Sequence, residues 1–173
     1  RKSYVSTRML SYNFIMTNLK AFQDYYPEAF GHCFGCGAEN PHGLHIKSYW
    51  NDDANDATIA FYTPQPYHTG GYPGYVYGGL IAAILDCHGN GTAAAAGYRF
   101  HGRAMGSLPA LRYVTASLQL DYLKPTPMGM TLELHARILE VTARKVRMEL
   151  WLTAAGVVTV KAQMVSVALP PSP

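Results

Sequence analysis

The sequence has few charged residues, few cysteines and no long uncharged apolar run. Charged side chains make up 14% of the 173 residues against 49% hydrophobic ones, and we expect part of the surface to be buried in an oligomer. The 14 basic and 11 acidic residues form no dense basic run, which argues against a nucleic-acid-binding protein. The most apolar stretch, 78–97, contains Asp86, His88 and Asn90, and so does not predict a membrane span.

Cysteine occurs only three times, at positions 33, 36 and 87. An odd count in a chain of this size is not typical of a disulfide framework, so we expect a soluble protein in the reducing cytoplasm. The N-terminus is basic up to Asp24, as in some transit segments, but it lacks a secretory core. We interpret it as an ordinary leading helix. The length predicts one main domain.

The first half of the chain predicts helix, loop and two short strands. Residues 3–30 carry apolar side chains at intervals near 3.6 and are expected to form one or two helices. The Gly- and Pro-rich segment 32–44 predicts a loop. Short strands are expected at 45–50 and 58–62, followed by a turn-rich loop that enters a long helix at Gly78.

The second half has the periodicity of strands. Apolar and polar residues alternate over 114–122, 132–138 and 146–152, and a last strand runs from the turn at 155–156 to about 169. Four strands with short turns predict an antiparallel meander. The expected architecture is α+β: one antiparallel sheet of about six strands wrapped around one long helix.

Asp86 is the only acidic residue in the apolar segment 78–97. Burying a carboxylate among apolar residues costs several kcal/mol unless partners offset it, so such a group is often kept for chemistry. Desolvation also raises its pKa toward the range of a general base. A structural Asp, paired or solvated, remains the alternative.

Gly78 and Gly79 open the helix about two turns before Asp86. Free backbone amides at a helix N-terminus suit an oxyanion, and glycine lets a carbonyl oxygen approach them closely. A tight loop-to-helix junction would explain the two glycines equally well.

The segment GYPGYVYGGLIAAILD, with the Ala-rich helix and four strands that follow, resembles the hotdog-fold acyl-CoA thioesterases of the phenylacetate-pathway (PaaI-like) superfamily. The resemblance covers about residues 31–169. It implies a hotdog domain over 31–173, preceded by a helical extension over 1–30. It also implies hydrolysis of an acyl-CoA thioester without a metal or other cofactor.

The resemblance implies roles for particular residues. The amide of Gly78 would polarise the thioester carbonyl, and Asp86 would attack it or activate water. Thr115, ten residues before Pro125, would support the water or the carboxylate. Tyr77 stands where the family usually has His. Sites of this family form between two protomers, so we expect a homodimer or a dimer of dimers.

Other residues near Asp86 have competing interpretations. Asn90 shares the helix face of Asp86 and could hydrogen-bond its carboxylate, or equally cap a kink between Gly89 and Gly91, whereas His88 points to another face. Cys87 has no neighbouring base to activate it and is interpreted as a small buried residue.

Cys33 and Cys36 form half of a zinc-ribbon pattern, and His32, His42 and His45 could in principle complete four ligands. A second such pair is missing, so we predict no metal site, and we expect the loop to pack the N-terminal segment against the sheet. A zinc-stabilised interaction module remains a less favoured alternative.

Candidate substrate-binding residues are Tyr77, Gly79, Asn90, Arg99 and Arg103, of which the two arginines are expected to contact coenzyme A phosphates. A hotdog protein that binds an acyl-CoA or aromatic ligand without hydrolysing it is the alternative function.

Overall fold

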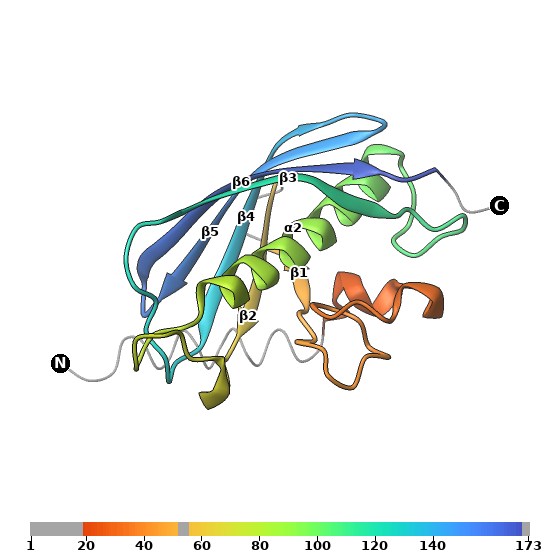
Figure 1. The fold of residues 1–173 in the computed structure, drawn as a ribbon. Helices are drawn as coiled ribbons and strands as arrows, with labels where there is room; N and C mark the ends of the chain where they lie inside the picture. Colours follow the sequence, from red (N-terminus) through yellow and green to blue (C-terminus); the bar gives the residue numbers. More distant parts are fainter. Residues whose placement is uncertain (1–18, 52–55, 171–173) are drawn as a thin grey trace.

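One long helix lies against one face of a single antiparallel sheet (Figure 1). The computed structural model describes residues 19–51 and 56–170. Helix α2 spans Gly78–Phe100 and crosses the sheet, with apolar side chains of both elements forming the core. This arrangement confirms the predicted α+β architecture.

Within the described residues the sheet has six strands in the order β1-β2-β4-β5-β6-β3, and every neighbouring pair is antiparallel. The strands are β1 (Ser48–Trp50), β2 (Ala57–Tyr62), β3 (Tyr113–Tyr122), β4 (Leu132–Val141), β5 (Lys145–Ala154) and β6 (Val157–Ala168). Ala155 and Gly156 both have positive φ, at 49° and 77°, as the two-residue hairpin between β5 and β6 requires. This hairpin lies where the sequence predicts a turn.

The predicted four-stranded meander is wrong at its first member. β4, β5 and β6 follow one another across the sheet, but β3 pairs with β6 and forms an edge. The connection from β3 to β4 passes beside the loop that precedes α2, where Tyr75 and Pro127 form a bridge. Alternation indicates that a segment is a strand and which face it buries, but it does not identify the partner strand.

Helix α2 is buried along most of its length and on most of its faces. Glycine inside a helix costs about 1 kcal/mol relative to alanine. At Gly89 the close packing accounts for glycine, because a Cβ there would lie 2.1 Å from Sδ of Met164 on β6. The glycine therefore lets the helix approach the sheet closely.

The N-terminal segment contributes only short turns within the described residues. The predicted helix over 3–30 lies largely outside them; Phe22–Tyr25 (η1) and Glu28–Phe30 (η2) form single 3-10 turns. A third turn, η3, spans Pro66–His68. Of the helices in the described part of the chain, none is long and apolar enough to cross a membrane.

Candidate active site

Asp86 lies half-buried on α2 and accepts a hydrogen bond from the hydroxyl of Thr115 on β3. The Thr115 oxygen in turn accepts a hydrogen bond from Nδ2 of Asn90 at 2.8 Å. Oδ1 of Asn90 accepts one from the buried hydroxyl of Ser166 on β6 at 3.0 Å. Four side chains from three elements thus form one hydrogen-bonded chain that ends at the carboxylate.

The pKa of Asp86 is raised above its ordinary value, mainly because burial removes water from the carboxylate. The hydrogen bond from Thr115 opposes this shift by stabilising the charged form, and the neighbouring Cys33 adds to it. Asp86 is therefore a carboxylate with raised basicity that is still held in one orientation.

The sheet brings Thr115 and Ser166 to the same point on α2. They are direct partners on β3 and β6, and the register shifts between Thr115 and Ser117. Such a bulge re-aims neighbouring side chains and is common beside functional sites. Both hydroxyls hydrogen-bond the side-chain amide of Asn90. Ser166 therefore orients this amide, and the amide in turn orients the Thr115 hydroxyl.

A cavity of about 590 Å³ opens beside this chain of hydrogen bonds. Asp86, Asn90 and Thr115 form part of its wall, together with the three cysteines and apolar residues of η2 and the start of β3. Arg112 also lines the cavity and lies over the ring of Phe30, 4.8 Å from its centroid. The cavity is mainly apolar with one carboxylate at its wall, which suits a substrate that has an apolar body and a reactive polar group.

The start of α2 faces a different cavity, of about 650 Å³, lined by Gly78, several tyrosines and the end of β3. The amides of Leu80 and Ile81 donate to the carbonyl of Tyr77, whereas none of the backbone hydrogen bonds among the described residues uses the amides of Gly78 or Gly79. The hydroxyl of Tyr122 donates to the carbonyl of Gly78 at 2.7 Å and anchors the first turn to β3.

Gly78 and Asp86 are eight residues apart on one helix, which at 1.5 Å per residue separates them by about 12 Å. The helix start and the carboxylate also open into separate cavities. One thioester cannot reach both groups of a single chain. The structure thus brings together Asp86, Asn90 and Thr115, but not the pair Gly78 and Asp86.

The remaining predicted substrate-binding residues have separate positions. The Tyr77 side chain is 59% exposed, and a Cβ on Gly79 would lie 2.4 Å from its ring. The guanidinium of Arg99 lies over Trp50, 4.8 Å from the ring centroid. Arg103 donates to the carbonyls of Ser107 and Pro109, both at 2.6 Å, and so braces the loop after α2.

His88 belongs to the core rather than to the Asp86 side of the helix. It is fully buried, and its ring nitrogens lie 3.0 Å from the Ser48 hydroxyl and 3.4 Å from that of Thr58. Burial lowers the pKa of His88 to about 3, so the ring is neutral at physiological pH. His88 thus joins α2 to β1 and β2 through hydrogen bonds.

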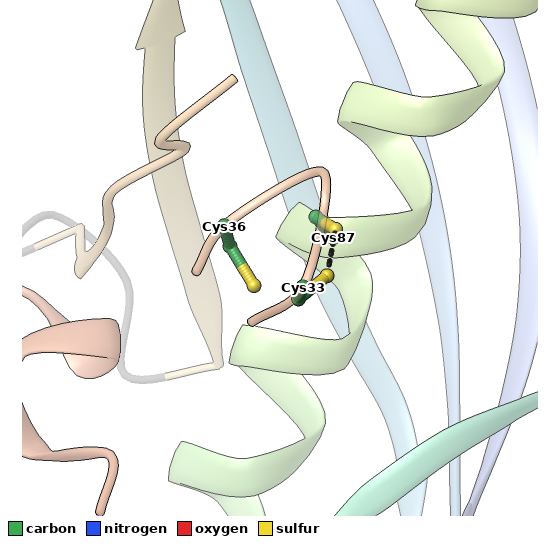
Figure 2. Close-up of side chains that lie close together, drawn as sticks. All are labelled: Cys33, Cys36 and Cys87. Atoms are coloured by element: carbon green, nitrogen blue, oxygen red, sulfur yellow. Dashed lines mark hydrogen bonds between the residues drawn. The ribbon is translucent and has the colours of Figure 1, made fainter. Parts of the chain in front are cut away.

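The three cysteines meet at the cavity wall (Figure 2). Their sulfur atoms lie within 4.8 Å of one another, and those of Cys33 and Cys87 are 3.6 Å apart. Hydrogen bonds with Cys36 and Cys87 lower the pKa of Cys33, whereas hydrogen bonds with Cys33 and Cys36 raise the pKa of Cys87. Cys87 is buried as predicted, but it has two thiol neighbours that its surrounding sequence does not reveal.

Sequence reasoning missed Ser166, Arg112 and Tyr122. Ser166 had a usable signal, because it is a polar residue between Val165 and Val167 in a strand. The contacts of Arg112 and Tyr122 depend on how distant segments meet, and no local pattern marks them.

Comparison with known proteins identifies the family. A family model described as the Thioesterase superfamily matches residues 73–161. A thioesterase superfamily protein from Shewanella loihica PV-4 is 43% identical, covering 84% of this chain and 100% of its own, with a TM-score of 0.62. The chain belongs to the thioesterase superfamily, and the predicted resemblance and hotdog fold are confirmed.

More distant structures share the fold. The E. coli PaaI protein from the phenylacetic acid degradation operon is 15% identical over 75% of this chain and 83% of its own, with a TM-score of 0.59. The Streptococcus mutans UA159 protein smu.793, solved bound to acetyl CoA, is 16% identical over 73% and 90%, with a TM-score of 0.57. At these identities the likeness shows the fold alone. No curated protein matches the chain.

Proposed function

We propose that this protein hydrolyses an acyl-CoA thioester, with Asp86 as the acting carboxylate. The observation that carries the proposal is the hydrogen-bonded chain from Ser166 through Asn90 and Thr115 to Asp86 at the wall of a largely apolar cavity. A carboxylate that is partly desolvated, yet held by the Thr115 hydroxyl, combines raised basicity with fixed direction. Membership of the thioesterase superfamily supports the same reaction class.

In this reaction the thioester carbonyl oxygen accepts a hydrogen bond from the amide of Gly78, and the positive end of the α2 dipole favours the charge that develops there. Asp86 takes a proton from water as the water oxygen attacks the carbonyl carbon. The tetrahedral intermediate then expels the coenzyme A thiolate, which takes up a proton. Direct attack by Asp86, giving an anhydride that water cleaves, uses the same groups and yields the same products.

A homodimer is required by this mechanism, because about 12 Å separates Gly78 from Asp86 within one chain. Strand β3 supports such a dimer: it is an edge strand of ten residues, and most of its side chains are exposed. A long exposed edge is an aggregation hazard that proteins usually cover. Pairing two copies near β3 would bring the helix start of one toward Asp86 of the other.

The two cavities support the proposed substrate class. The one at the helix start is lined by Tyr72, Tyr75, Tyr77 and Tyr122, which would accommodate an acyl or aromatic group. The printed description of the Streptococcus mutans structure, bound to acetyl CoA, supports coenzyme A as the carrier. Arg99 and Arg103 remain candidate phosphate contacts, and Arg99 is the more exposed of the two.

The alternative is ligand binding without hydrolysis, which Tyr77 favours because it replaces the histidine usual in the family. A panel of short, medium, long and aromatic acyl-CoAs, followed by release of free thiol, separates the two functions. Saturable binding without thiol release by the wild-type protein would establish the alternative.

Mixing two inactive variants tests the two-chain site. Asp86→Asn removes the base, and Gly78→Pro removes the amide N–H. Each mixed dimer regains one of its two sites. Random exchange in an equal mixture makes about half of the dimers mixed, so about a quarter of wild-type activity should return. Mass measurement verifies that the subunits have exchanged. If activity does not recover after verified exchange, or if the protein is strictly monomeric, the proposal is contradicted.

A further inference from the structure

The three cysteine thiols come from two elements far apart in sequence. Cys33 and Cys36 belong to the loop after η2, and Cys87 lies in α2 next to Asp86. All three sulfur atoms lie within 4.8 Å of one another, and Figure 2 shows the three side chains side by side. The sequence lacks the second cysteine pair of a zinc ribbon, but Cys87 adds a third thiol to Cys33 and Cys36.

Backbone hydrogen bonds fix the loop that carries Cys33 and Cys36. The amide of Gly37 donates to the Cys33 carbonyl at 2.8 Å, and the amide of Ile46 donates to the Gly35 carbonyl at 3.0 Å. Bonds of this kind hold the two loop sulfurs in place beside the helix, as the surroundings of a metal ligand do.

Gly35 lets the loop lie directly on the helix. A Cβ at this position would stand 2.1 Å from the sulfur of Cys87 and 3.1 Å from its Cβ. Any larger residue would push Cys33 and Cys36 away from the third thiol. The close approach is thus part of the cluster's construction.

The sulfur positions fit a tetrahedral thiolate site. Zinc bound to sulfur at about 2.3 Å places two ligands of a tetrahedron about 3.8 Å apart. The sulfur atoms of Cys33 and Cys87 are separated by 3.6 Å, and that of Cys36 lies within 4.8 Å of both. A disulfide would use only two of the three sulfurs and leave a buried thiol beside it, whereas one metal ion uses all three.

We propose that Cys33, Cys36 and Cys87 bind one zinc ion. The three cysteines line the cavity that Asp86 also lines, so water from this cavity completes the tetrahedron. The ion neutralises thiolates that would otherwise repel one another at a half-buried site. Its role is structural: it ties the loop to the helical turn that carries Asp86 and forms one wall of the cavity.

Metal analysis tests this site independently of turnover. Protein purified without chelator should contain about one zinc per chain by mass spectrometry of the elements. The metal-free protein titrated with Co²⁺ should show the sulfur-to-cobalt charge-transfer band of three thiolates at one equivalent. Added Zn²⁺ should then protect all three thiols from alkylation.

Variants identify the ligands. Cys36→Ser and Cys87→Ser should each weaken zinc binding by about 100-fold, because each removes one of the three thiolates. Asp86→Asn, which changes the same cavity but removes no thiol, is the matched control and should keep its zinc while losing activity.

The proposal is overturned if the wild-type protein takes up neither ion, or if Cys87→Ser binds zinc as tightly as wild type. It is also overturned if the thiols react at the same rate with and without Zn²⁺. If the cysteine variants do not fold, the cobalt spectrum of the wild-type protein still decides. An inactive protein that binds zinc would refute the proposed hydrolysis and leave the metal site standing.

Discussion

The hydroxyl of Thr115 on β3 donates a hydrogen bond to the carboxylate of Asp86 in the middle of α2. A threonine hydroxyl has one proton, and here that proton is committed to the carboxylate, while Asn90 donates to the hydroxyl oxygen. Thr115 is therefore suited to orient Asp86. Asn90 acts on the carboxylate through Thr115 and not by direct contact.

Replacing Thr115 by valine should move the pH dependence of the reaction. The hydrogen bond stabilises the charged carboxylate, so its loss raises the pKa of Asp86 further. Asp86 acts only when deprotonated, and the acidic limb of kcat/KM should therefore shift upward by about one pH unit. Thr115→Ser retains the hydroxyl donor, so the acidic limb of its kcat/KM profile should match that of the wild type. Identical limbs for valine and serine would show that this bond does not control Asp86.

The amide of Gly78 can be removed with little harm to the helix. Gly78 is the first residue of α2, where proline is tolerated, and Tyr77 has φ −59° and ψ 127°, as a residue before proline prefers. Gly78→Pro should lower kcat by about 100- to 1000-fold, the usual effect of losing one oxyanion donor.

Gly78→Ala is the matched control for this substitution. It keeps the N–H, and its Cβ would lie 3.5 Å from the Tyr122 ring, an ordinary contact. We expect it to retain activity within a few-fold, measured in the same thiol-release assay. Equal loss in both variants would implicate local packing instead of the amide.

The Tyr77 hydroxyl should contribute little to turnover. Its side chain is exposed, and none of the side-chain hydrogen bonds between described residues involves it. Tyr77→Phe should therefore keep kcat within about two-fold, whereas Tyr77→Ala should raise KM because the aromatic wall of the cavity is lost. A large fall in kcat for Tyr77→Phe would assign the hydroxyl a chemical role.

Buried His88 should make the protein less stable in acid. The folded state keeps the ring neutral with a pKa of about 3, while the unfolded chain binds a proton near pH 6.5. The free energy of unfolding should thus fall as the pH drops below 6.5, by up to about 1.4 kcal/mol per pH unit. Urea denaturation between pH 5 and 7.5 measures this slope. His88→Gln should flatten it, and an unchanged slope would mean that other groups cause it.

Much of the fold can be predicted from the sequence, because periodicity and turn residues act locally. The start of α2 at Gly78, the strands and the hairpin at Ala155 and Gly156 all follow from patterns a few residues long. The pairing of β3 with β6 does not, because a strand's alternation is the same whichever neighbour it has.

The same distinction holds for the candidate site. Asp86 is conspicuous as a lone acid in an apolar helix, and the spacing of Asn90 places it on the same face. Ser166 joins them only through the β3–β6 register, and Cys87 meets Cys33 across 54 residues of sequence. Contacts of this kind depend on the tertiary fold, and no local sequence pattern predicts them.

The position of β3 has a consequence for how the chain matures. Strand β3 is synthesised before β4 and β5, yet among the strands of the described residues it pairs only with β6. During synthesis β3 must remain unpaired until the end of the domain has left the ribosome, since non-local pairing comes late in folding. The pairing of Thr115 with Ser166, and the bond by which Ser166 fixes the Asn90 amide, therefore form only after β6 has been made.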